Sequence, residues 1–166
     1  MKVLAALLLA LSTLWGLLTR QPPAPLDGPV DRIVIDKSDR TLDLIQDGEV
    51  VRAYAVGLGF APQGAKERQG DGRTPEGVFR VDRRNDASRF HLSLGLDYPQ
   101  PADVERAAAG GYGPGGDIFI HGQPPAVPAG FVVPGDWTEG CVAVSDRAMD
   151  EIWDVAPLGT VVEIVP

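Results

Sequence analysis

The sequence predicts a mainly β fold, a β-sandwich or open barrel with one or two helices. Its 20 glycines and 15 prolines make up about a fifth of the 166 residues, against a usual share of roughly 12%. Short β-branched runs separated by turn residues fill most of the chain, and only two segments in the globular part have helical spacing. With 44% apolar residues, the chain can bury a core, and its length favours a single domain.

Strand patterns begin near Val30. Residues 32–36 and 41–45 are β-rich runs joined by a turn, and Asp47-Gly48 separates the second run from residues 49–56. Because Asp-Gly between two such runs is a strong hairpin signal, we expect a three-stranded meander. Further strands are expected at 78–81, 90–96, 117–120, 142–144 and 160–165, with long Gly/Pro-rich loops at 57–77 and 123–138.

Two helices are expected between these strands. The first spans 101–109 and is stopped by two glycines. The second begins after Ser145, a good N-cap residue, and ends before 157–159. Its apolar positions are Ala148, Met149, Ile152, Trp153 and Val155.

The first 20 residues differ from the rest of the chain. Lys2 is followed by sixteen uncharged, mostly apolar residues, which is the layout of a secretory signal. No small-residue cleavage site closes the run, so an uncleaved signal anchor and a buried N-terminal helix stay open as alternatives. The Pro-rich linker 21–29 follows, and the globular domain is expected at 30–166. The segment predicts export to the periplasm or cell envelope, with membrane attachment only through a possible N-terminal anchor.

The net charge is −8. Such an acidic surface repels phosphate backbones, so nucleic acid is not an expected partner.

The chain has a single cysteine, which excludes an internal disulfide and a cysteine-rich zinc site. Cys141 follows Gly140, whose backbone freedom allows close approach to a ligand, and the N–H groups of both residues could form an oxyanion hole. A thiol needs a base to act as a nucleophile at neutral pH. His121 ends an apolar strand twenty residues earlier and could supply that base, although a buried cysteine and an unrelated histidine fit the spacing equally well.

Residues 118–144, with His-Gly, a Gly/Pro-rich loop and Thr-x-Gly-Cys-Val, resemble the catalytic segment of the L,D-transpeptidase family, also called the YkuD domain. The resemblance extends to the Thr-Pro-Glu-Gly-Val-Phe stretch within 70–79, to 91–99 and to 115–122. The resemblance covers nearly all of 30–166. Within the family, the sequence is similar to an exported bacterial branch with a Thr-x-Gly-Cys motif. It therefore implies a YkuD-like β-sandwich.

The resemblance also implies the chemistry. Cys141 would be the nucleophile and His121 its base, with the carbonyl of Gly122 orienting the imidazole and the N–H groups around Gly140 holding the oxyanion. The thiol would attack the diamino acid–D-Ala bond of a peptidoglycan tetrapeptide stem, and an amine of another stem would resolve the thioester into a 3→3 cross-link. No metal or other cofactor is implied, and the implied partners are peptidoglycan stem peptides.

Substrate contacts are expected from Trp137, Thr138 and Glu139. Many members of the family carry a histidine where this sequence has Glu139. That carboxylate could bind the incoming amine or point into solvent, and Trp137 could line a groove or pack on the sheet. Basic residues of the first long loop could meet stem carboxylates or be solvated; these are Lys66, Arg68 and Arg73. His91 is expected to be structural.

Two rival functions remain at this stage. Water instead of an amine could resolve the same acyl-enzyme, which would make the protein an L,D-carboxypeptidase or a hydrolase of existing links. A non-catalytic wall-binding module is the alternative from a different class.

Overall fold

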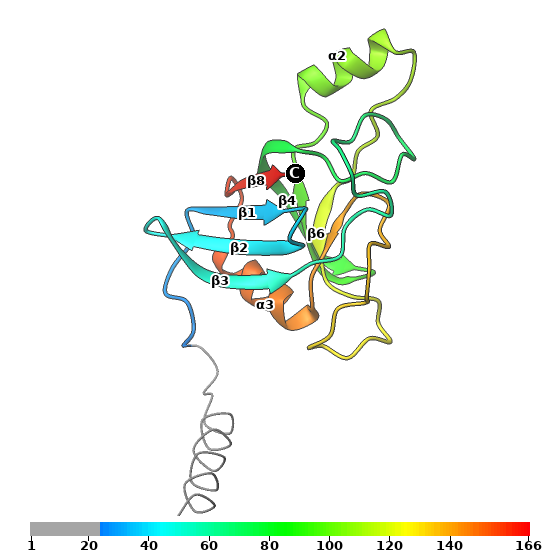
Figure 1. Ribbon diagram of the computed structural model, residues 1–166. Helices are drawn as coiled ribbons and strands as arrows, with labels where there is room; N and C mark the ends of the chain where they lie inside the picture. Colours follow the sequence, from blue (N-terminus) through cyan, green and yellow to red (C-terminus); the bar gives the residue numbers. More distant parts are fainter. Residues whose placement is uncertain (1–23) are drawn as a thin grey trace, which may run out of the picture.

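The computed structural model describes residues 24–166, shown in colour in Figure 1. The predicted signal peptide or anchor and residues 21–23 of the predicted linker lie outside the described residues. Among residues 24–166, no helix has the length and apolarity needed to cross a membrane.

The described residues form eight strands in one continuous hydrogen-bonded order. The pairings of β1 with β8 and of β6 with β7 are parallel, and the other pairings are antiparallel. From one edge to the other the strands are β3 (Glu49–Ala55), β2 (Thr41–Gln46), β1 (Arg32–Asp36), β8 (Val161–Val165), β4 (Gly77–Ser88), β5 (His91–Leu96), β6 (Phe119–His121) and β7 (Val142–Ala143).

Strand β4 joins the two halves of this arrangement. Residues Gly77–Arg80 pair with β8, whereas the segment from Val81 to Ser88 pairs with β5. Register shifts between Val81 and Arg83 and between Asn85 and Ser88 interrupt the second ladder; such irregularities bend and twist a strand. The meander β1–β3 and the strands β5–β7 therefore belong to different sheets that share β4. This arrangement confirms the predicted mainly β class and matches a YkuD-like sandwich.

The core lies between the sheets and beneath helix α3 (Asp146–Val155). In β1 and β2 every second residue is fully buried, which is the pattern of strands with one face on a core. Each such isoleucine or leucine contributes about 1.5–3 kcal/mol of hydrophobic stabilisation. The largest fully buried side chains include Ile33, Leu44, Leu94, Ile120, Met149 and Ile164.

Both predicted helices are present. Helix α3 begins where expected, because Ser145 Oγ accepts a hydrogen bond from the Ala148 N–H at 3.2 Å, and the helix packs against β5 and β6. Trp153 is the exception to the predicted apolar face: it is only partly buried, and the Arg84 guanidinium lies 3.8 Å from its ring centroid. Helix α2 (Pro101–Ala109) projects from the sheets in Figure 1 and buries only Ala107.

Several strand boundaries differ from the sequence prediction. The strand predicted at 78–81 is β4, and it runs on to Ser88 because its charged second half pairs with β5 at an exposed face. The strand predicted at 117–120 is β6, shifted to 119–121. Asp117 has a left-handed φ of 56°, a conformation incompatible with a strand, so pairing starts only after it and places His121 inside the strand.

The two predicted loops lie side by side. Phe60 N–H donates to the Thr138 carbonyl at 2.9 Å, and Gly57 and Ala143 exchange backbone hydrogen bonds of 2.8 Å each. Gly59 N–H donates to Thr74 Oγ1 at 3.1 Å. The bonds of Phe60 and Gly57 fix the first loop against the segment that carries Cys141, and the Gly59 bond connects the two ends of the first loop.

Candidate active site

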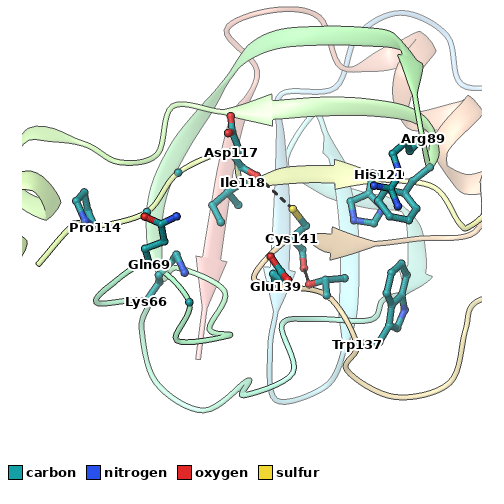
Figure 2. Close-up of a pocket in the computed structure, with 16 residues that line it drawn as sticks. Lys66, Gln69, Arg89, Pro114, Asp117, Ile118, His121, Trp137, Glu139 and Cys141 are labelled. Carbon is teal, nitrogen blue, oxygen red and sulfur yellow. Dashed lines mark hydrogen bonds between the residues drawn. The ribbon is translucent and has the colours of Figure 1, made fainter.

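A cavity of about 810 Å³ opens between the two loops and the ends of β5 and β6. Figure 2 shows its lining, with Cys141 near the middle, Lys66 and Gln69 to one side, and His121 and Trp137 to the other. The residues of the sequence prediction that line it are Cys141, His121, Trp137, Thr138, Glu139 and Lys66.

Cys141 lies immediately before β7 and is partly buried. Its Sγ donates a hydrogen bond to the Asp117 carbonyl at 3.4 Å, which Figure 2 marks as a dashed line. Burial raises the pKa of the thiol, the bond with the Phe119 backbone lowers it, and the carboxylate of Asp117 raises it, with a net increase. The cysteine is therefore a neutral thiol at pH 7.

His121 is buried, with 4% of its surface exposed. Its Nδ1 lies 2.7 Å from the Gly122 carbonyl oxygen. Because a carbonyl only accepts hydrogen bonds, Nδ1 carries the proton and Nε2 keeps its lone pair. Burial lowers the pKa of His121 and the bond to Gly122 raises it by less, so the net change is downward. The imidazole is neutral at pH 7 and able to take a proton at Nε2.

Aromatic rings surround this imidazole. The Phe90 ring is stacked on it with centroids 4.8 Å apart and an interplanar angle of 26°. Trp137 meets it edge-on with centroids 5.8 Å apart, and Phe90 and Trp137 contact each other at 5.7 Å. The two rings limit how far the histidine can rotate and cover part of its surface. Trp137 therefore both lines the cavity and packs on the histidine.

The segment before the cysteine is fixed by Thr138. Its hydroxyl donates to the Cys141 carbonyl at 2.7 Å and accepts the Gly140 N–H at 3.1 Å. Gly140 has a φ of 131°, and a Cβ there would lie 2.7 Å from the Arg73 carbonyl oxygen. Only glycine fits this position. Thr138 thus uses its hydroxyl within the loop, and the Gly140 N–H already has a partner.

Gly122 is a second position that has no room for a side chain. A Cβ there would lie 2.5 Å from Asp146 Oδ1 and 2.9 Å from the Phe90 carbonyl oxygen. The absence of a side chain lets the turn after β6 pass between β5 and α3 while its carbonyl bonds the histidine.

Glu139 is exposed at the cavity rim.

The other predicted residues lie outside the cavity. His91 is on the surface with its Nε2 2.6 Å from Asp150 Oδ1, which fits its expected structural role. Arg73 pairs with Glu67 at 3.4 Å, and neither it nor Arg68 lines the cavity. Within residues 24–166 no group of three or more histidine, cysteine, aspartate or glutamate side chains could hold a metal ion.

Sequence reasoning missed several wall residues: Phe90, Gln69, Arg89, Ile118 and the glycines of 113–116. The sequence predicts Phe90 as the first residue of a strand, but it lies in the turn between β4 and β5. The pairing of β5 with β6 brings that turn to the histidine. The Pro-Gly-Gly composition of 113–116 is the one local signal that could have indicated a segment approaching a ligand.

The chain that carries this site matches a known domain family. Residues 30–164 match the family model described as the L,D-transpeptidase catalytic domain, YkuD. The chain therefore belongs to the YkuD family of L,D-transpeptidase catalytic domains. The resemblance expected from the sequence is confirmed at the level of the family.

An individual relative carries a name from the same family. The chain is 29% identical over 127 residues to YafK of Escherichia coli strain K12, which is provisionally named an L,D-transpeptidase; the match covers 73% of this chain and 45% of YafK. The chain thus spans about half the length of that relative.

Two solved structures share the fold. An L,D-transpeptidase from Xylanimonas cellulosilytica matches with a TM-score of 0.58 and 24% identity, over 87% of this chain and 65% of that one. Pgp2, a helical cell shape determining protein from Campylobacter jejuni, matches with a TM-score of 0.60 and 24% identity, over 83% of this chain and 48% of that one.

Proposed function

We propose that the protein is a peptidoglycan L,D-transpeptidase that uses Cys141 as its nucleophile and His121 as its general base. The observation that carries the proposal is that the only thiol of the sequence and a buried histidine whose Nε2 keeps its lone pair line one cavity. Family membership supplies the substrate class, stem peptides of the cell wall.

Acylation starts from the neutral pair. The thiol gives up its bond to the Asp117 carbonyl and passes its proton to His121 Nε2 as Sγ attacks the carbonyl carbon of the diamino acid–D-Ala bond. The Sγ–C bond forms and the C–N bond breaks. The imidazolium returns the proton to the leaving amine, D-alanine departs, and a thioester remains on Cys141.

An amine of a second stem then resolves the thioester. Its nitrogen attacks the acyl carbon, its proton goes through His121 to the departing sulfur, and the free thiol is restored. The product is a 3→3 cross-link between two diamino acids. Glu139 at the rim suits the ammonium form of the amine, which gives one proton to solvent before its neutral nitrogen attacks.

The oxyanion is held by backbone N–H groups at the Gly140–Cys141 turn. The Gly140 nitrogen is 3.1 Å from Thr138 Oγ1. Its N–H therefore stabilises the developing charge only if its hydrogen bond to the Thr138 hydroxyl lengthens. The Cys141 N–H is proposed as the second donor, and Thr138 acts as a positioning residue through its bond to the Cys141 carbonyl.

The proposed location is the cell envelope, because the apolar run after Lys2 has the layout of an export signal and peptidoglycan lies outside the cytoplasmic membrane. Changes in cross-linking alter cell-wall organisation, so an effect on cell shape, as for Pgp2, is expected.

The experiment is incubation of the full chain with a disaccharide-tetrapeptide, followed by mass analysis. Cross-linked dimers with release of D-alanine support the transpeptidase. Tripeptide without dimers assigns the same acyl-enzyme to an L,D-carboxypeptidase. If Cys141→Ala keeps the wild-type activity, both enzymatic proposals are wrong.

A further inference from the structure

One wall of the cavity carries a buried cation that the proposed chemistry does not use. Lys66 is 3% exposed and lines the same cavity as Cys141. A buried ammonium is costly unless it is paired, and few proteins keep one without a structural or binding reason.

The partner of Lys66 is Asp71, with Nζ 2.7 Å from Oδ1. Asp71 also accepts the backbone N–H groups of Glu67, Arg68 and Arg73 at 2.8, 3.0 and 3.1 Å. Burial would raise the pKa of Asp71, but these N–H groups and the Lys66 ammonium together lower it to about 2. The carboxylate therefore stays ionised over the whole physiological range and holds the Lys66 side chain in place.

The ammonium still has a donor to offer. Lysine Nζ carries three protons; Asp71 takes one, and the Arg68 carbonyl, at 3.2 Å, takes another. Within residues 24–166 those are the two hydrogen bonds of this nitrogen. The remaining proton is available to a molecule in the cavity.

The surroundings of Lys66 are tightly packed. A Cβ at Gly115 would lie 3.1 Å from Lys66 Cε, Gln69 N–H bonds the Gly113 carbonyl at 2.9 Å, and Arg106 bonds the Lys66 carbonyl at 3.2 Å. The lysine is thus held between its own loop, 57–77, and the segment 113–116. Arg68 and Arg73, which belong to the loop 57–77 as well, do not line the cavity.

The position of Lys66 relative to the catalytic pair defines which part of a substrate it meets. The leaving amine must lie within reach of His121, and the acyl part extends from the attacked carbon in the other direction. Figure 2 shows Lys66 and Gln69 on the side of Cys141 away from His121 and Trp137. Lys66 therefore faces the acyl part of the peptide.

The charge distribution favours an anion there. The protein is acidic overall, and the exposed Glu139 lies at the rim of the cavity near the thiol. An anionic group of the substrate is repelled at that point and attracted to the ammonium. A diamino acid side chain that ends in both an amine and a carboxylate has the matching pair of charges.

We propose that Lys66 is the substrate-binding residue that receives a carboxylate of the acyl-donor stem, namely the side-chain carboxylate of its diamino acid. The inference rests on the proposed transpeptidase function and adds a specificity determinant to it.

The test compares two tetrapeptides, one with this carboxylate free and one with it amidated, on the full chain. A hydrogen bond between charged groups discriminates by about tenfold or more. We expect the wild type to prefer the free acid by about this factor in kcat/KM. Lys66→Met should lose that preference, with a rise in KM for the free acid that is clearly larger than any loss on the amidated peptide.

Two further variants separate binding from folding. The double variant Lys66→Met with Asp71→Asn removes both charges and should show the same loss of preference. Lys37→Met is the matched control, because Lys37 is equally buried at 3% and paired with Glu76 at 2.7 Å but lies outside the catalytic cavity. It should keep the wild-type preference.

Equal rates of the wild type on both peptides, or an equal loss on both peptides in Lys66→Met, would overturn the proposal. A preference that follows amidation of the D-Ala carboxylate or of the glutamate carboxylate instead would also overturn it. Failure of the transpeptidase function itself is recognised separately, by D-Ala release that persists in Cys141→Ala.

Discussion

His121 Nδ1 lies 2.7 Å from the carbonyl oxygen of Gly122. This bond sets the tautomer of the ring without adding a negative charge beside it. An aspartate in that place would raise the pKa of the imidazole by attraction; a neutral carbonyl raises it less than burial lowers it. Since burial also raises the pKa of Cys141, both groups are neutral at rest. The site therefore holds a thiol and a free base rather than a preformed ion pair.

The reactivity of Cys141 should reflect this neutral pair. We expect its alkylation by iodoacetamide to rise with pH with a midpoint above the ordinary thiol value of 9.0, because burial disfavours the thiolate. Intact-mass measurement follows the reaction cleanly, since the chain has one cysteine. A midpoint below pH 7 would show a thiolate–imidazolium pair and contradict this account.

Stability should depend on pH through His121. The unfolded chain binds a proton at this histidine near pH 6.5, whereas the folded protein binds it only at lower pH. The unfolded state therefore holds more protons in that interval, and the free energy of unfolding falls as the pH drops through about 6.5 towards the folded-state pKa. Urea titrations between pH 5 and 8 should show this slope in the wild type and a smaller slope in His121→Gln; equal slopes would contradict the assignment.

Thr138 should matter for catalysis without touching the reacting atoms. Thr138→Val removes the bonds to the Cys141 carbonyl and from the Gly140 N–H. We expect a loss of about 1–3 kcal/mol in stability and a slower acylation with little change in KM. Thr138→Ser keeps the hydroxyl and should retain most of the acylation rate; if it is as slow as the valine variant, the hydroxyl is not the important group.

Gly140 should not tolerate a side chain. Alanine there adopts an unfavourable φ of 131° and places Cβ 2.7 Å from the Arg73 carbonyl oxygen. The strain alone costs about 1–3 kcal/mol, and displacing the loop should abolish acylation. Gly130→Ala is the matched control in the same loop, because its Cβ would meet only the Arg147 side chain at 3.6 Å. Thermal unfolding and acylation of both variants test the contrast, and an active Gly140→Ala would refute it.

The features predicted well from sequence are those decided locally. The Asp47-Gly48 turn and the alternation in 32–36 and 41–45 are sufficient for the meander, and Ser145 is sufficient for the start of α3. The second half of β4 was missed because its charged residues, such as Arg83 and Arg84, carry no apolar alternation; pairing with β5 makes it a strand.

The candidate site likewise combines residues that the sequence indicates with contacts that only the fold creates. A single cysteine after a glycine, and a histidine at a strand end, are visible in the sequence. The stacking of Phe90 on the imidazole depends on the neighbouring strand, and the place of Lys66 in the wall depends on a loop more than seventy residues before the cysteine. Contacts of this kind follow from topology and leave no local pattern. Thr138 is predicted to bind substrate, and that stays a prediction: the residue lines the cavity, and its hydroxyl bonds within the loop.

The central claim is that Cys141 forms the acyl-enzyme. Intact-mass analysis of the full chain, incubated with a disaccharide-tetrapeptide in the absence of an acceptor, tests it most directly. We expect an adduct on Cys141 equal in mass to the donor less D-alanine, and no adduct on Cys141→Ala. Release of D-alanine by Cys141→Ala at the wild-type rate would contradict it.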